Sequence, residues 1–235
     1  MNTSVDIQHI EFVLKFQDSL SEVWDISFLK QRNIIPSHWE MIKPPIRKQD
    51  MSLFAFQNGI YLLCRHDLVA FLENLSGKSS EELESPAIMT RTLESFPKIS
   101  YQGIDMNLEG NTVFSTEEEC RTYLLDILLD PTDRHASDQA IVQSIANFVY
   151  ALDDGFFTLT VRNTKVEFPE GDSAAILSFN GNFHRDVPRV SNEEQRHGLL
   201  QIIQNWRNDV ESYQEVVDQR FLKRLDLMPV SSVSQ

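Results

Sequence analysis

LFAFQNGIYLLC, at residues 53–64, consists of two apolar runs on either side of Asn58-Gly59. Asn-Gly readily adopts the positive φ angles of a type I′ turn, so the pattern predicts a β-hairpin with a two-residue loop. Both faces of this hairpin are apolar, which predicts a central position in a sheet that is covered on both sides. The expected register pairs Phe56 with Tyr61 and Phe54 with Leu63 on one face, and Ala55 with Leu62 and Leu53 with Cys64 on the other.

Strand and helix patterns flank this hairpin. Residues 9–15 (HIEFVLK) alternate apolar and polar side chains, as expected of a strand, and residues 18–32 have mostly helical spacing. Prolines at 36, 44 and 45 leave room only for a short edge strand. The run 68–72 fits either a strand or a helix. Ser85 before Pro86 predicts a helix that continues to about Phe96.

A similar pattern begins again near Ser100. Thr116 is expected to cap a helix that carries three glutamates in its first turn and stops at Asp130-Pro131. Ser191 and Glu194 form a capping box ahead of a long helix, whose apolar stripe is expected to face the protein's own core. The strands expected here are residues 101–108, 145–151 and 174–179, together with a hairpin of 157–161 and 165–168 that turns at Asn163-Thr164 and has one polar face.

Each half of the chain therefore contains a strand, a helix, a weak strand, a three-strand meander and a long helix. We predict one compact α+β unit of two similar halves, residues 1–98 and 99–228, followed by a frayed tail at 229–235. Its sheet should be largely antiparallel with helices on one face, and the repeated order suggests an internal duplication. The topology resembles that of saddle-shaped folds such as the TATA-binding protein.

The composition is typical of a globular domain, since 41% of the 235 residues are hydrophobic and 24% are charged. No stretch approaches the roughly 18 to 20 apolar residues of a membrane span. Residues 1–9 lack the pattern of an export signal, so we expect a cytoplasmic protein. Cys64 and Cys120 are accordingly expected to be free thiols.

The net charge of −14 argues against binding to nucleic acid, because it repels phosphate backbones. The best basic cluster contains only Lys43, Arg47 and Lys48, and it lies between Glu40 and Asp50. We interpret this cluster as a solvated loop that the neighbouring prolines stiffen.

Several segments resemble a family of uncharacterised, chiefly cyanobacterial proteins. The resemblance covers most of the chain but carries no catalytic motif, so it implies no activity. Its segments are DMSLFAFQNG at 50–59, YQGIDMNL at 101–108, NFVY at 147–150, FNGNF at 179–183 and the stretch from Asn205 to Phe221.

Known catalytic motifs are incomplete in this sequence. His184-Arg185-Asp186 copies the start of a protein-kinase catalytic loop, but Ser191 stands where that loop needs Asn. Gly77-Lys78-Ser79 resembles the end of a phosphate-binding loop, but Leu72 replaces its first glycine. The six histidines show no zinc-ligand spacing. We therefore assign no catalytic, cofactor-binding or metal-ligating residue and expect no cofactor.

The leading hypothesis is a non-enzymatic binding or scaffold protein, whose partner is an unknown protein or a second copy of the chain. One alternative is a metal-dependent hydrolase that assembles a site from His38, Glu40, His184 and Asp186. Another is a carrier of an apolar small molecule between sheet and helices. The apolar hairpin also predicts that the free face of residues 1–98 is buried by the second half or by another copy.

Overall fold

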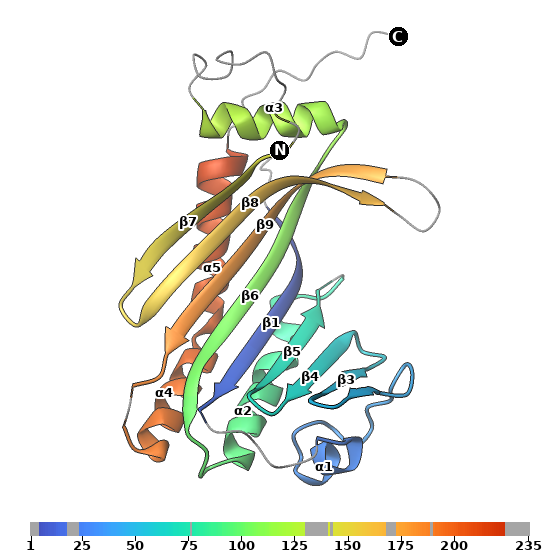
Figure 1. Cartoon of the computed structure of the whole chain (residues 1–235), viewed down its shortest axis with the longest axis vertical. Coiled ribbons are helices and arrows are strands. Elements are labelled where there is room, and N and C mark those ends of the chain that lie inside the picture. Colours follow the sequence, from blue (N-terminus) through green and yellow to red (C-terminus); the bar gives the residue numbers. More distant parts are fainter. Residues whose placement is uncertain are drawn as a thin grey trace.

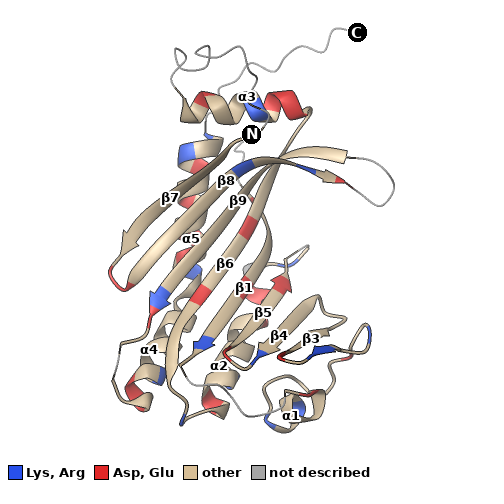
Figure 2. Ribbon diagram, viewed as in Figure 1, with Lys and Arg blue, Asp and Glu red and all other residues tan. Residues whose placement is uncertain are grey.

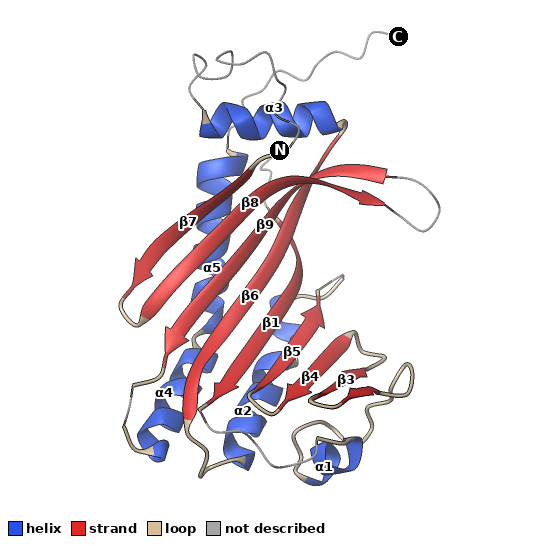
Figure 3. Ribbon diagram, in the orientation of Figure 1, coloured by secondary structure: helices blue, strands red, loops and turns tan. Residues whose placement is uncertain are grey.

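A computed structural model describes residues 5–17, 24–75, 77–129, 141, 143–167, 173–188 and 190–223. Within these residues the fold is α+β: one nine-stranded antiparallel sheet with five helices packed on it (Figures 1 and 3). The predicted fold class and the antiparallel sheet are confirmed. The predicted helix end at Asp130-Pro131 and the tail at 229–235 lie outside the described residues.

The first half supplies five strands. β1 continues the predicted alternation, β2 is the expected short edge strand, and the ambiguous run after the hairpin is a strand, β5. In order the elements are β1 (Asp6–Phe16), α1 (Ile26–Gln31), β2 (Ile46–Lys48), β3 (Met51–Ala55), β4 (Ile60–Arg65), β5 (Leu68–Asn74), a 3₁₀ turn (Ser80–Glu82) and α2 (Ser85–Ser95).

The second half supplies four longer strands and the C-terminal helices. Thr116 and Ser191 cap their helices as predicted, each accepting a hydrogen bond from a backbone N–H in the first turn. In order the elements are β6 (Tyr101–Phe114), α3 (Glu117–Leu128), β7 (Ile145–Leu152), β8 (Gly155–Glu167), β9 (Ser173–Asp186), α4 (Asn192–Gln204), α5 (Trp206–Val217) and a π-helical turn, η3 (Asp218–Leu222).

The two halves meet in the middle of the sheet, where β1 pairs with β6. The strand order is β2-β3-β4-β5-β1-β6-β9-β8-β7, so the last strand of each meander returns to the first strand of its own half. The helices α2, α4 and α5 lie behind this sheet in Figure 3, and α3 crosses the upper end of β6, β8 and β9.

The core lies between the sheet and the helices. The predicted apolar stripe of the last helix faces this core, as expected, although the helix is broken at Asn205 into α4 and α5. Trp206 contacts Phe12 edge to face, with ring centroids 6.5 Å apart. Tyr213 is fully buried, and its hydroxyl donates a 2.9 Å hydrogen bond to the carbonyl of Phe179.

The first hairpin differs from the predicted register by one residue. Ala55 pairs with Tyr61 and Phe54 pairs with Leu62, because residues 57–59 form a three-residue loop. Only Gly59 has a positive φ angle there, +81°, so the turn is not type I′. The hairpin also lies toward one end of the sheet and is covered on one face only. Its covered face holds Phe54, Phe56, Ile60, Leu62 and Cys64, all buried.

The predicted second hairpin is wrong. Asn163-Thr164 does not turn the chain, because β8 continues through both residues to Glu167 and pairs with β9 along its whole length. The turn lies earlier, at Asp153-Asp154, between β7 and β8. His184-Arg185-Asp186 is likewise the end of strand β9 rather than a loop, and this places its side chains on the sheet.

Both cysteines are buried free thiols, as predicted. Burial raises the pKa of Cys120 to about 12 and that of Cys64 well above its ordinary value. Thiols of this kind are poor nucleophiles at neutral pH. Among the described residues, no helix has the length and apolarity needed to cross a membrane.

Candidate functional site

The sheet has two unlike faces. One face packs against the helices, and we call the other, which faces the viewer in Figure 1, the open face. Side chains alternate between the two along each strand. On β6, Ile104, Met106 and Leu108 point into the core, so Asp105 and Asn107 point to the open face.

One row of directly paired residues crosses all nine strands on the open face. Its members are apolar from β2 to β1, polar at β6 and β9, and apolar again at β8 and β7. In strand order the row is Ile46, Leu53, Leu63, Ala70, Val13, Asp105, His184, Phe156 and Ala151.

The first half of the open face is apolar except for Lys48 and Arg65, which pair with Met51 on either side, and we call its apolar side chains the apolar half. Its larger side chains are only partly covered: Ile46 is 42% and Tyr61 39% exposed, and Leu63 is half-buried. The second half continues in the same sheet and does not fold over this surface. The apolar half consists of Val13, Ile46, Met51, Leu53, Ala55, Tyr61, Leu63, Leu68, Ala70 and Leu72.

The second half of the open face is polar over the middle of β6, β8 and β9, a region that we call the polar half, and apolar side chains are exposed again on β7. The polar side chains bond to each other across strands. Asn182 donates a 2.6 Å hydrogen bond to Asn107, and Asn107 donates a 2.7 Å bond to Glu11. Thr160 donates a 2.7 Å bond to Asn147. These contacts join β1, β6 and β9 in one chain and β7 and β8 in another.

A charged network lies at the boundary between the two halves. Asp105 is only 8% exposed and receives Lys15 Nζ at 2.5 Å and His184 Nδ1 at 2.5 Å. A carboxylate can only accept, so His184 donates from Nδ1. Its Nε2 lies 3.2 Å from Asp186, an exposed carboxylate, and the ring of Phe156 is 4.8 Å from the imidazole centroid.

This network orients a histidine, and the described residues bonded to it do not complete a known catalytic arrangement. The buried Asp105 fixes the ring of His184, as the carboxylate of an Asp–His pair does in hydrolases. However, the group that faces Nε2 is a carboxylate, and no hydroxyl or thiol of the described residues is bonded to it. A general base without a nucleophile or an electrophile to act on gives no defined reaction.

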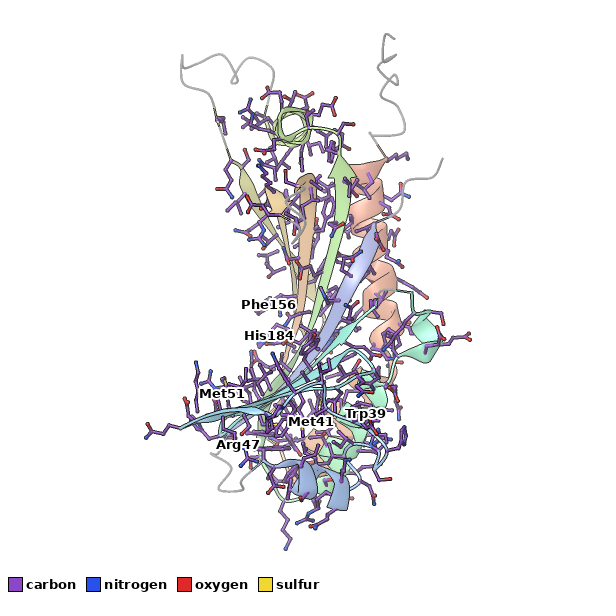
Figure 4. The ribbon with its side chains drawn as sticks, turned by 90° about the vertical axis from the view of Figure 1, so that its right-hand side faces the viewer. Trp39, Met41, Arg47, Met51, Phe156 and His184 are labelled. Carbon is purple, nitrogen blue, oxygen red and sulfur yellow. The ribbon has the colours of Figure 1, made fainter. Side chains whose placement is uncertain are left out.

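The candidate metal ligands do not come together in one place. His184 and Asp186 are neighbours on β9, but His38 and Glu40 flank Trp39, which packs on Phe56 beside the first hairpin. That position is five strands from β9, or roughly 24 Å at the usual strand spacing. Figure 4 shows Trp39 well apart from His184. Within the described part of the chain, no group of three or more His, Cys, Asp or Glu residues could hold a metal ion.

The open face is hollowed beside the charged network. A depression of about 300 Å³ lies over β1, β6, β9 and β8, and most of the residues that line it have polar side chains. In Figure 4 the strands of the first half run at a steep angle to those of the second half. Phe156 and His184 nevertheless project to the same side of the molecule as Met51, since all three belong to the open face. The lining includes His9, Glu11, Leu72, Asn107, Glu109, Thr158, Thr160, Asn180 and Asn182.

Acidic groups predominate in this central region. Glu11, Glu109 and Asp186 add carboxylates around the Lys15–Asp105 pair, and Figure 2 shows the acidic residues of β6 near the middle of the sheet. His9 lies 3.5 Å from Glu109. The open face therefore joins an apolar surface to an acidic belt.

A second hollow lies on the helix side. It has a volume of about 480 Å³ and is bounded by the start of β1, the segment between β5 and α2, and α5. Its walls are mixed: Ile10, Leu83 and Trp206 are apolar, whereas Lys78 and Glu211 are charged.

Sequence reasoning placed Asp105 and Asn107 on the polar side of a strand but gave them no role. His184 was placed in a loop; its predicted pairing with Asp186 is found, but its predicted meeting with His38 and Glu40 is not. Lys15, Asn182 and Phe156 were missed, because their meeting depends on the pairing of β1, β9 and β8 with other strands. The signal that could have found them is the alternation of each strand, combined with the correct strand order.

Neither protein-family models nor curated proteins match this sequence. The resemblance to uncharacterised, chiefly cyanobacterial proteins therefore stays an expectation.

Proposed function

We propose that the protein is a non-enzymatic binding protein, and that its open face binds a polypeptide carrying both apolar and basic side chains. The observation that supports this most is the apolar row from Ile46 to Val13, on the side of the sheet that the helices leave bare. In this row Ile46, Leu53 and Leu63 are only partly covered, whereas Ala70 and Val13 are buried. The same row becomes charged at Asp105.

The apolar half has no evident role in the fold. The core behind it is already complete, since Phe54, Ile60, Leu62 and Phe71 on the covered face of the same strands are all 0% exposed. Exposed apolar patches of a few hundred Å² are uncommon in soluble proteins unless they bind something. A contact surface explains why leucines occupy these positions.

The acidic belt favours a basic partner. The chain carries a net charge of −14, and Glu11, Asp105, Glu109 and Asp186 are carboxylates on the open face of β1, β6 and β9. Complementary charge speeds association and excludes like-charged competitors. A partner segment with apolar residues at one end and Lys or Arg at the other would match both parts of the face.

A hydrolytic function has less support. His184 has an orienting carboxylate, but the four residues considered for a metal site belong to two separate places.

The two buried, unpaired thiols agree with a reducing compartment such as the cytoplasm.

The element order also supports the idea of an internal duplication, which we retain as a proposal. Each half contains a strand, a helix, a three-strand meander that returns to the first strand, and a closing helix. The antiparallel pairing of β1 with β6 is what a local two-fold relation between the halves would produce.

A carrier of an apolar small molecule is the second candidate, and the hollow beside Trp206 favours it. Its volume of about 480 Å³ falls within the usual range for small-ligand sites. Native mass spectrometry of the freshly purified chain would show a bound molecule if this candidate is correct. Loss of that molecule in a Trp206→Ala variant would assign it to the hollow.

The binding proposal is tested by selection from a display library of random peptides on the immobilised full-length chain. We expect enriched peptides to combine apolar residues with Lys or Arg. Leu63→Glu places a charge in the centre of the apolar half and should abolish their binding. Val190→Glu, a control at a 45% exposed apolar residue between β9 and α4, should not.

Circular dichroism should show the same fold for both variants. The proposal is wrong if no peptide is enriched, or if the enriched peptides bind native protein and the Leu63→Glu variant equally well.

A further inference from the structure

β7 forms one end of the sheet and has a strand on one side only. It runs for eight residues, Ile145–Leu152, and pairs with β8 throughout. No strand of the described residues pairs with its outer edge. Half of the backbone N–H and C=O groups of such an edge strand point outward and are available to another strand.

The composition of β7 gives this edge no protection. Its sequence, IANFVYAL, contains neither a charged residue nor a proline. The opposite edge, β2, is only three residues long, includes Arg47 and Lys48, and follows Pro44-Pro45. Proteins normally blunt exposed edges in the way that β2 is blunted. An uncharged edge of eight residues is therefore suited to pairing.

The side chains of β7 also leave apolar area exposed. Val149 is 69% exposed and Ile145 is 58% exposed, both on the open face. On the other face Phe148 packs on Phe221 and Tyr150 stacks on Phe157, so the strand is held firmly in its position. A partner strand would meet a fixed and apolar edge.

We propose that β7 of a second copy pairs antiparallel with this edge. Charge complementarity identifies the occupant, because residues of opposite charge lie next to the two ends of β7. Exposed Asp153 and Asp154 follow its last residue, while exposed Arg162 on β8 lies directly opposite its first residue, Ile145. Asp154 is already bonded to Arg185, so Asp153 is the carboxylate left for the partner.

In an antiparallel pair of identical strands, the start of each strand lies beside the end of the other, so the same contact forms at both ends of the interface. The Asp153 of each copy then lies beside Ile145 of the other, about 10 Å from the backbone of Arg162, which is two strand spacings. An extended arginine side chain spans this gap. The carboxylate of Asp153 thus faces a guanidinium at both ends of the shared edge, and this contact is self-complementary, as a two-fold interface requires.

The arrangement also has a consequence for the shape of the assembly. Residues on the same face must oppose each other, so the two-fold axis stands perpendicular to the sheet. The two nine-stranded sheets become one continuous sheet, with both open faces on the same side. A pair of identical surfaces held side by side is bivalent.

Sedimentation velocity of the full chain over a concentration series tests the pairing. We expect a concentration-dependent dimer of the native protein. Val149→Lys should weaken it at least about tenfold, because edge lysines oppose strand pairing. Val113→Lys is the matched control: Val113 is 66% exposed near the end of β6, away from β7, and the dimer should be unaffected.

Two charge variants identify the occupant. Asp153→Arg puts two arginines at each end of the interface, and Arg162→Asp puts two carboxylates there, so each variant alone should be monomeric. Mixing them should restore a dimer, because each end of the mixed pair again joins Arg to Asp.

The proposal is overturned if the native chain stays monomeric up to about 100 μM, a concentration at which a specific dimer should be populated. It is equally overturned if Val149→Lys dimerises as the native chain does, or if mixing the two charge variants gives only monomers.

Discussion

The two halves of the open face differ although they belong to one sheet and cover one core. In the first half this face is leucine-rich, with Leu53, Leu63 and Leu72 on adjacent strands. In the second half, β6 and β9 hold Asn107, Asn182 and other hydrogen-bonding groups on this face, and apolar side chains are exposed again only toward the edge strand β7. On the covered face both halves are mostly apolar and buried, with Glu73 and Arg185 as charged exceptions that have bonded partners.

This comparison shows which apolar side chains the fold requires and which it does not. A sheet with helices on one side needs an apolar covered face and tolerates a wet open face, as the second half illustrates. The apolar half departs from this pattern without adding to the core. We infer that its leucines serve contact with another molecule, and the following predictions test this inference.

The largest loss of stability is expected when a carboxylate is placed on the covered face of the first hairpin, and we compare it with the same change on the open face. Phe54→Asp puts a carboxylate at a fully buried position opposite Leu62 and should lower the free energy of unfolding by about 4 kcal/mol or more. Leu63→Asp, on the open face, should cost about 1 kcal/mol, because water can reach the new group. Urea unfolding followed by circular dichroism measures both. Similar losses would mean that the open face is buried in solution.

A smaller effect is expected from a carboxylate that positions the helix behind the apolar half. Glu73 is fully buried and accepts hydrogen bonds from the backbone N–H groups of Glu84 and Ser85, at the start of α2, and from Lys78. Glu73→Gln should cost about 2 kcal/mol in the same urea experiment, because a charged helix cap is lost. Glu81→Gln, an exposed control, should cost almost nothing. If neither variant lowers the free energy of unfolding measurably, Glu73 does not stabilise the start of α2.

The smallest effect is expected in the polar half. Asn182→Leu removes the hydrogen bond to Asn107, but both positions are half-buried and water can replace the lost donor. The cost in unfolding free energy should stay below about 1 kcal/mol. The variant should bind more of the fluorescent probe anilinonaphthalene sulfonate, because the apolar surface becomes wider. A cost of several kcal/mol would show that the polar half, too, is part of the structural core.

Local patterns predicted much of the fold. The alternation of β1 and β6 and the caps at Thr116 and Ser191 depend on neighbours within a few residues, and they were confirmed. The hairpin register failed because Asn58-Gly59 was interpreted as a two-residue turn, whereas Gly59 closes a three-residue loop. Asn163-Thr164 failed because pairing with β9 along its full length outweighs a weak turn preference.

The candidate site was far less predictable. Lys15, Asp105 and His184 are separated by more than seventy residues at each step and meet because β6 lies between β1 and β9. No short-range pattern contains that strand order. The apolar character of the hairpin was visible in the sequence, but the exposure of its second face follows from where the helices pack.

The most direct test of the account is the affinity of an enriched peptide for a variant with Leu53→Thr, Leu63→Thr and Leu72→Thr together. Threonine keeps the strand preference while it removes apolar area. Fluorescence anisotropy should show a dissociation constant at least about tenfold higher than for the native chain, a change of about 1.4 kcal/mol, with an unchanged circular dichroism spectrum. An unchanged dissociation constant would contradict the claim that the apolar half of the open face is the binding surface.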